Sequence, residues 1–320
     1  MGARPSAFTL TAPGPLRLYS TEELLRLPPP TWLVGGILPE GSLSVLYGPP
    51  ESGKSFLAID LALSVATGLP WHGHPVEQGF VVYVAAEGGS GISKRVRAWL
   101  EAKQVAARGV PVAWLVESLT VNKESDDVGR LMQRLDDELE HTPRLIVVDT
   151  LARCLEGDEN TQLDMGRFVA GVDMLRHEYK AAVMIVHHTR LDGDRERGNT
   201  ALRGGTDTML SATKDENSIL VECTKQKDWE HFPPLSVTLT PVRDTESCIL
   251  VSDTVGREAQ LLALFIGETA YSASELLARA GVTGMSRKTF FRALGDTKQS
   301  GRILKENGKY RLAGVTSDTP

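Results

Sequence analysis

Eight consecutive residues near the start of the chain have the types and spacing of a phosphate-binding loop. The string Gly48-Pro49-Pro50-Glu51-Ser52-Gly53-Lys54-Ser55 fits the pattern GxxxxGK[ST]. Such a turn lets successive backbone N–H groups surround a phosphate, and the helix that follows adds the partial positive charge of its N-terminus. The lysine then reaches the β- and γ-phosphates, and the serine hydroxyl supplies an oxygen to Mg²⁺. The sequence predicts a nucleotide site that extends from Gly48 to Phe56.

Glu51 places an anion beside the predicted phosphate site. Only backbone groups line such a loop, so its side chain is expected to point to solvent. Some G-protein α-subunits carry the same GESGKS string, and hydrolysis is therefore compatible with this residue.

Polar side chains also follow three other apolar segments. Asp149 comes directly after LIVV and matches the aspartate that holds Mg²⁺, although many strands end in Asp as a turn residue. Glu87 follows FVVYVA and can orient and deprotonate an attacking water, the alternative being a solvated carboxylate in a Gly-rich turn. His187 and His188 follow VMIV, where His188 is the better candidate to contact the γ-phosphate. The pair has no third residue at metal-ligand spacing.

A polar, Gly-rich stretch and a short basic turn supply further cations. Arg195, Arg197 and Arg203 lie in LDGDRERGNTALRGGTDT, which is predicted to be a mobile loop. One guanidinium there can complete a neighbouring subunit's nucleotide site, or the loop can grip nucleic acid or merely be solvated. Lys225 and Lys227 follow SILVEC and either project from a sheet end into an intersubunit site or form an ordinary charged turn.

Alternating strands and helices must position these residues. The apolar runs predict strands at 43–47, 80–85, 112–116, 145–148, 182–186, 218–223 and 235–239, and helices at 55–68, 92–103, 128–140 and 165–179. Alternation of this kind implies an α/β fold with a mostly parallel sheet and helical crossovers. Ligands of open α/β sheets lie at the carboxyl ends of the strands, so the phosphate loop, Glu87, Asp149 and the histidines are expected to converge there.

Composition excludes several classes of protein. Of the 320 residues, 41% are hydrophobic and 24% charged, which excludes a wholly disordered chain, a collagen and a coiled coil. No apolar run approaches the ~20 residues that cross a bilayer, and the first 20 residues lack the apolar stretch of a secretory signal. Cys154, Cys223 and Cys248 are scattered, which fits a reducing compartment. A cytoplasmic protein without a membrane partner is expected.

Six motifs in a fixed order resemble the RecA-like hexameric ATPases, and especially the replicative helicase family of broad-host-range plasmids with its phage and bacterial relatives. They are GPPESGKS, YVAAEG, LIVVDTLAR, VMIVHHT, RGNTALRG and KQKD, and the resemblance covers roughly residues 30–245. It implies a RecA-like P-loop fold, ATP hydrolysis with Mg²⁺ at the subunit interfaces of a ring, and movement on single-stranded DNA. The chain departs from its relatives at Glu51, where they usually carry Gly.

The resemblance also implies a role for each matching residue. Lys54 and Ser55 become the phosphate and Mg²⁺ ligands, and Asp149 the Mg²⁺ aspartate. Glu87 becomes the catalytic base and His188 the γ-phosphate sensor. The implied trans-acting cations are Arg197 as the arginine finger, with Lys225 or Lys227 as a second one.

The C-terminal part differs in charge and pattern. Residues 254–313 hold 10 Lys and Arg against 5 Asp and Glu, whereas residues 1–253 hold 25 against 35. The segment predicts two helices, a third basic helix and a hairpin around Asn307-Gly308, which resembles a winged helix-turn-helix. Duplex DNA would then meet the basic residues of the third helix and the wing, Arg287, Lys288, Arg292, Lys305 and Lys309. A module for protein contacts is the alternative.

These patterns divide the chain into an arm (1–29), an ATPase domain (30–253), a winged-helix-like domain (254–313) and a tail (314–320). The leading hypothesis is a Mg²⁺-dependent ATP hydrolase of the helicase type that acts on DNA in replication, recombination or repair and belongs to a phage, plasmid or mobile element. Its expected partners are copies of itself in a ring, for which the resemblance implies a hexamer, and single-stranded DNA. Two alternatives remain: an ATP-switched DNA-binding regulator without unwinding activity, and a ring scaffold locked by nucleotide.

Overall fold

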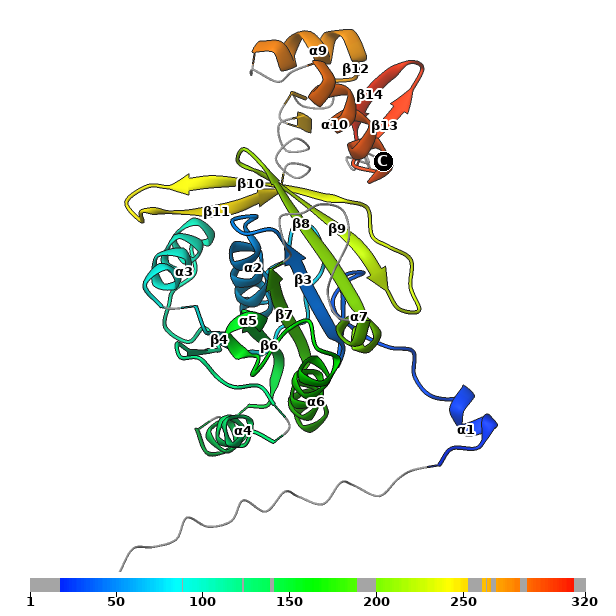
Figure 1. Cartoon of the computed structure of the whole chain (residues 1–320). Coiled ribbons are helices and arrows are strands. Elements are labelled where there is room, and N and C mark those ends of the chain that lie inside the picture. Colours follow the sequence, from blue (N-terminus) through cyan, green and yellow to red (C-terminus); the bar gives the residue numbers. More distant parts are fainter. Residues whose placement is uncertain are drawn as a thin grey trace, which may run out of the picture.

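A nine-stranded sheet forms the centre of the molecule (Figure 1). The computed structural model describes residues 18–87, 89–122, 124–138, 141–188, 200–252, 261–262, 264–265, 269–282 and 287–313. The strand order is β11-β10-β9-β8-β3-β7-β6-β4-β5, and the six strands from β8 to β5 are parallel. The other three continue the sheet as antiparallel neighbours.

The central strands keep their apolar runs in the buried layer. The parallel strands are β3 (Leu43–Gly48), β4 (Phe80–Ala85), β5 (Val112–Leu115), β6 (Pro143–Asp149), β7 (Ala182–His188) and β8 (Thr208–Asp215). The antiparallel strands are β9 (Ser218–Gln226), β10 (Leu235–Val242) and β11 (Ser247–Ser252). Near-continuous apolar runs are typical of parallel strands that are covered on both faces.

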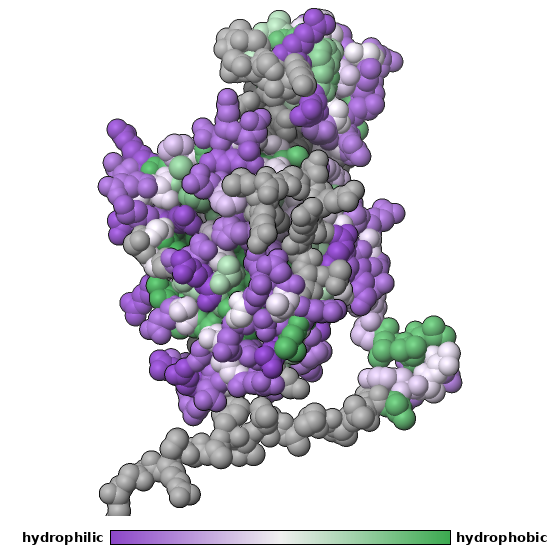
Figure 2. Space-filling view, viewed as in Figure 1, coloured by the Kyte–Doolittle hydropathy of each residue, from purple (hydrophilic) through white to green (hydrophobic). Residues whose placement is uncertain are grey.

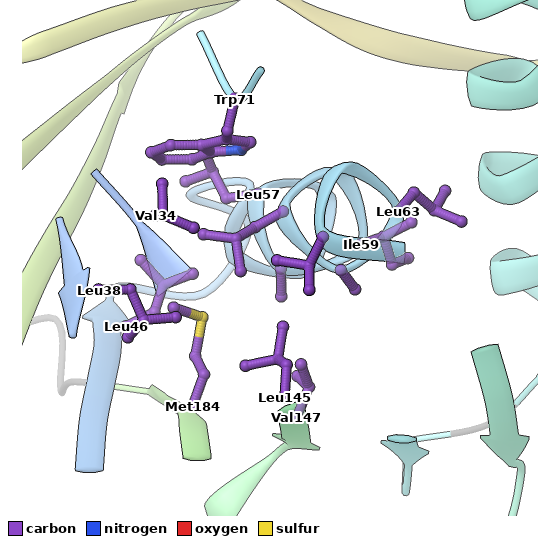
Figure 3. Packing of buried hydrophobic residues seen from close by; sticks show 14 of the residues in the cluster. Val34, Leu38, Leu46, Leu57, Ile59, Leu63, Trp71, Leu145, Val147 and Met184 are labelled. Carbon is purple, nitrogen blue, oxygen red and sulfur yellow. The ribbon is translucent and has the colours of Figure 1, made fainter. Parts of the chain in front are cut away.

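Helices cover both faces of the sheet and divide the core into two clusters. Helices α2 (Lys54–Thr67) and α3 (Ser90–Lys103) pack over one face, with side chains such as Leu57, Trp71 and Met184 (Figure 3). Helices α4 (Asp126–Glu138), α5 (Leu151–Cys154), α6 (Gln162–Tyr179) and α7 (Thr200–Gly205) pack over the other. Because alternate strand residues point to opposite faces, neighbours such as Ile146 and Val147 belong to different clusters.

Smaller elements flank this body. Helix α1 (Thr21–Leu25) precedes a two-stranded pair, β1 (Trp32–Val34) and β2 (Leu38–Pro39). At the other end, β12 (Tyr271–Ser272), α9 (Ala273–Val282), α10 (Arg287–Gln299), β13 (Ile303–Glu306) and β14 (Lys309–Leu312) enclose a separate small core around Phe290. The β13–β14 hairpin turns at Asn307 and Gly308, which both have positive φ. This order matches the expected helix and hairpin pattern, and the winged-helix assignment stays a prediction.

Two strands and one helix are the main elements of the body that the sequence did not predict. The segment predicted to be a polar loop contains α7, whose Leu202 is buried, and is followed by β8 beside β3. Strand β8 buries Thr, Ser and Ala beside only two large apolar residues, so it lacks a strong hydrophobic signal. The two glycines that end α7 argue against a helix on propensity alone, and packing on α6 outweighs them. Strand β11 was missed as well.

The predicted α/β class with a large, mostly parallel sheet is confirmed. In the part of the chain that the structure describes, no helix has the length and apolar character needed to cross a membrane.

Candidate nucleotide-binding site

The four predicted strand ends meet at one edge of the sheet. Strands β3, β7, β6 and β4 are consecutive neighbours, with Gly48 beside His188 and Ala85 beside Asp149. Glu87 lies two residues beyond the end of β4. Parallel order alone brings these chain segments together, although they are spread over 140 positions of sequence.

The loop between β3 and α2 owes its shape to glycines at its two ends. Gly53 has φ +85°, and a Cβ there would lie 2.2 Å from Cδ1 of Ile219. A Cβ on Gly48 would lie 2.2 Å from the backbone oxygen of Ala212 in β8. Between them Glu51 has φ +63° and an exposed side chain, in agreement with the expected solvent orientation.

Lys54 is buried beneath this loop. Its ammonium donates to the backbone oxygens of Gly48 (3.0 Å) and Pro49 (2.7 Å) and to Oγ of Ser52 (3.3 Å). Burial lowers the pKa of Lys54 to about 8, and the carboxylates of Asp149 and Glu87 oppose the shift. The cation is thus held inside the loop by weak neutral acceptors, which a phosphate oxygen can replace.

Asp149 lies opposite the loop, with one contact on each carboxylate oxygen. Oδ1 accepts from the hydroxyl of Ser55 at 3.3 Å, and Oδ2 accepts from the hydroxyl of Tyr83 at 2.7 Å. Burial raises the pKa of the Asp149 carboxyl, while the two hydrogen bonds lower it. Tyr83 is itself fully buried in β4, so it fixes the direction of the carboxylate.

Glu87 is held from two sides. Its Oε1 accepts a hydrogen bond from Oγ1 of Thr150 at 2.9 Å and lies 3.3 Å from Nε2 of His188. The neighbouring His187 is buried, and burial, with His188 and Lys54 nearby, lowers its pKa to about 4. His187 is therefore neutral at physiological pH, whereas His188 and Glu87 form a polar pair at the mouth of the site.

Phe56 lies in the first turn of α2, beside the loop. The Arg95 guanidinium carbon of α3 lies 4.4 Å from the centre of its half-buried ring. This cation also lowers the pKa of Asp149 as a minor contribution. Phe56 thus links α2 and α3 next to the predicted phosphate site.

The residues around Asp149 fit a Mg²⁺ ion that arrives with a nucleotide. The serine hydroxyl and the buried carboxylate are hard oxygen donors, and a cation between them would offset the burial that raises the carboxyl pKa. Mg²⁺ takes one or two protein oxygens and fills its remaining positions with phosphate oxygens and water. Within the described ranges no group of three or more His, Cys, Asp and Glu side chains could hold a metal ion.

The predicted trans-acting cations lie away from this edge. Lys225 pairs with Met209 near the amino end of β8, and its ammonium contacts the backbone oxygens of Arg203 and Thr206 at the end of α7. Lys227 lies 3.8 Å from a carboxylate oxygen of Asp207. Since β8 runs parallel to β3, these lysines lie at the opposite edge from the loop and do not contact the chain's own site. Arg195 and Arg197 lie outside the described residues.

Tyr83 and Thr150 were not predicted from the sequence. Each is the hydroxyl partner of a predicted carboxylate, Tyr83 for Asp149 and Thr150 for Glu87. Tyr83 sits inside an apolar run, where an aromatic residue is typical of the core. Thr150 directly follows Asp149 in the sequence, and this adjacency was the one available signal.

Comparison with known proteins places these residues in context. A family model described as an AAA domain matches residues 15–194, which agrees with the predicted RecA-like P-loop fold. Proteins called DNA repair and recombination protein RadB, from two strains of Halobacterium salinarum, are 28% identical over 195 residues, which are 56% of this chain and 75% of the relative. A solved structure whose title describes an ATPase domain superposes with a TM-score of 0.47 at 11% identity, covering 66% of this chain and 86% of the other.

Proposed function

The chain belongs to the AAA domain family, and from this premise we propose that it is a Mg²⁺-dependent ATPase of the RecA-like helicase type. It acts on DNA in replication, recombination or repair, in the cytoplasm, and is encoded by a phage, plasmid or mobile element. One observation carries the proposal: the phosphate loop, a buried Mg²⁺-type aspartate and a held glutamate lie at one sheet edge. The RadB relatives, named for DNA repair and recombination, support the DNA partner.

Binding of ATP begins with an exchange of partners at Lys54. The ammonium leaves the loop oxygens of Gly48 and Pro49 for the β- and γ-phosphates, to which its charge is better suited. Ser55 and Asp149 would hold Mg²⁺, which neutralises charge on the phosphates when bound. Tyr83 keeps the Asp149 carboxylate turned toward Ser55.

Hydrolysis uses Glu87 to orient a water and accept its proton. Thr150 and His188 hold one oxygen of this carboxylate, and its side chain is 45% exposed, so the other oxygen can meet water. His188 lies between Glu87 and the end of β3, where it can contact the γ-phosphate and report its loss. The site is completed by a neighbouring copy in a ring, through Arg197 and either Lys225 or Lys227.

The experiment that tests the proposal measures ATP turnover with and without single-stranded DNA. We expect stimulation by DNA, and a loss of ~10²–10⁴ in kcat in Glu87→Gln with nucleotide binding retained. The exposed carboxylate variant Glu117→Gln is the control and should match the parent. Near-normal turnover in Glu87→Gln would remove it as the base, and turnover that ignores DNA would remove the DNA-dependent role.

A second candidate function, an ATP-switched DNA-binding regulator, is favoured by the surface of α10. Arg287, Arg292 and Lys298 are exposed on this helix together with Phe291, which is 46% exposed. Basic residues with an apolar side chain on one helix suit the major groove of duplex DNA. A strand-displacement assay separates the two functions, because the regulator binds duplex DNA and hydrolyses ATP without unwinding.

A further inference from the structure

The amino-terminal segment, residues 18–30, is a formed but uncovered apolar element. Every residue in it is exposed, and Leu18, Leu24, Leu25 and Leu27 are among the most exposed large hydrophobic side chains described. Ser20 and Glu23 nevertheless close a complete capping box on α1. A short helix is marginal alone in water, so the cap and the leucines together indicate a helix built to pack against something.

Three prolines hold this segment away from its own body. Pro28, Pro29 and Pro30 link α1 to β1 and cannot continue a helix. Figure 1 shows α1 standing apart at lower right, and Figure 2 shows apolar residues gathered on it. The body beside it thus leaves the leucines in water.

An apolar groove lies on the other side of the molecule. It has a volume of about 700 Å³ between α3 and the edge strand β5. Apolar side chains line it: Ile92, Val96, Leu100, Val105, Trp114 and Val116. Val116 is 48% exposed, so the floor reaches solvent. In Figure 1, α3 lies at the upper left, across the body from α1. We name this the α3 groove.

Charge favours the same pairing. Helix α3 carries Lys94, Arg95, Arg97 and Lys103 against one acid, Glu101, and Arg97 lines the groove. Residues 18–30 carry Glu22 and Glu23 against Arg26. An acidic apolar helix therefore matches a basic apolar groove, and the chain holds both halves.

We propose that α1 of one copy docks in the α3 groove of the next copy, with Leu24 and Leu25 as its anchors. The two surfaces lie on different sides of one chain, so the contact is head-to-tail and repeats. It closes into a ring or grows into a filament according to the rotation between copies. This contact concerns assembly and goes beyond the ATP chemistry proposed above.

Cross-linking of two full-length chains tests the contact. One chain carries Leu25→Cys, the other carries Val116→Cys and a different tag, and a short bismaleimide joins nearby thiols. We expect a cross-link between the two differently tagged chains. The control pairs Leu25→Cys with Phe291→Cys, an exposed site on α10, and the parent chain gives the background from its own three cysteines.

Sedimentation supplies a second, independent measurement. Leu24→Asp with Leu25→Asp should raise the dissociation constant for self-association at least about tenfold, because each leucine then keeps its anchor surface in water. Both side chains are exposed, so folding should be unaffected. Leu163→Asp, on an exposed leucine of α6, is the matched control and should leave association unchanged.

Three outcomes would overturn the docking. They are a Leu25–Val116 cross-link no stronger than the control, a cross-link that forms only within one chain, and association that ignores the aspartates at positions 24 and 25. Lys54→Ala separates the two proposals, since it should abolish turnover and keep the cross-link. A Lys54→Ala chain that cross-links normally, beside a parent that does not hydrolyse ATP, would overturn only the proposed function.

Discussion

Lys54 illustrates how one residue can be both a structural and a chemical part. Without nucleotide it satisfies three oxygens of its own loop, and burial lowers its pKa to about 8. The same burial makes the site sensitive to the proton on that nitrogen. A buried ammonium that gains a phosphate partner is worth more than one already paired with a carboxylate, because the exchange costs no ion pair.

Nucleotide affinity should therefore fall as pH rises above about 8. Below this pH Lys54 is protonated, and above it the free protein must take up a proton before the lysine attracts phosphate. The dissociation constant for Mg·ATP should rise toward about tenfold per pH unit above the pKa. Titration with a fluorescent ATP analogue across the pKa, from neutral to alkaline buffer, measures it. Lys54→Arg, whose charge persists, should give a flat profile, and a flat parent profile would contradict the role.

Glu51 has a conformation that suits glycine better than glutamate. Its φ of +63° is in the left-handed region, and its side chain is exposed. Glu51→Gly should raise the free energy of unfolding by up to about 1 kcal/mol and leave hydrolysis unchanged or faster. Urea denaturation measures the first effect. The control Glu101→Gly, in helix α3, should lose about 1 kcal/mol. A tenfold fall in turnover in Glu51→Gly would reveal a role for this carboxylate.

Among the elements, the contact between the phosphate loop and β8 limits the loop most. The backbone of Ala212 lies where a Cβ on Gly48 would sit, so the loop can approach β8 only as glycine. Strand β8 also starts the antiparallel part of the sheet, whose hairpin carries Lys225 back to the opposite edge. One strand thus fixes the loop on its own chain and the basic turn that faces away from it.

Gly48→Ala should displace the loop, because the facing group is backbone and cannot turn aside. We expect a loss of about 1–3 kcal/mol in stability and at least about tenfold weaker nucleotide binding. Thermal unfolding and the same fluorescent titration measure the two effects. Gly166→Ala on α6, where a Cβ meets open space, is the control and should be neutral or stabilising. Unchanged nucleotide binding in Gly48→Ala would show that the loop tolerates the shift.

The elements also show what a single sequence can and cannot predict. The strands β3, β4, β6 and β7 were predictable because LSVLY, FVVYVA, LIVV and AVMIV are continuous apolar runs, and their parallel order brought Asp149 and Glu87 to the loop. Strand β8 was not, because its buried residues are mostly small or hydroxylated. Nor was the Tyr83–Asp149 hydrogen bond, since it joins two strands 66 positions apart and depends on register.

For the molecule as a whole, the proposed role of Arg197 depends on a neighbouring copy. An arginine finger stabilises charge in the transition state and is worth ~10³–10⁵ in rate. Arg197→Ala should bind ATP nearly as well as the parent and hydrolyse it far more slowly. Mixed with Lys54→Ala it should regain some activity, because an Arg197→Ala copy keeps its phosphate loop and the other still supplies arginine. Turnover of mixtures over a range of ratios measures this, with subunit exchange confirmed by the tags used for cross-linking.

Each single variant measured alone is the control for that mixture and should stay inactive. No recovery at any ratio would rule out action on a neighbour, and Arg197 would then serve its own chain, contact DNA or have no role beyond the surface.

The place of β3 in the sheet also determines when the molecule can mature on the ribosome. Leu43 pairs with Val183 and Ser44 with Thr208, so both edges of β3 wait for segments made long after it. At ~5–20 residues per second, translation leaves this apolar strand unpaired for on the order of ten to thirty seconds. Open strand edges invite pairing with other chains, so the nascent polypeptide needs a chaperone or rapid helix formation beside it. A chain that stops before residue 208 carries an intact GxxxxGKS string on a strand that lacks its neighbour.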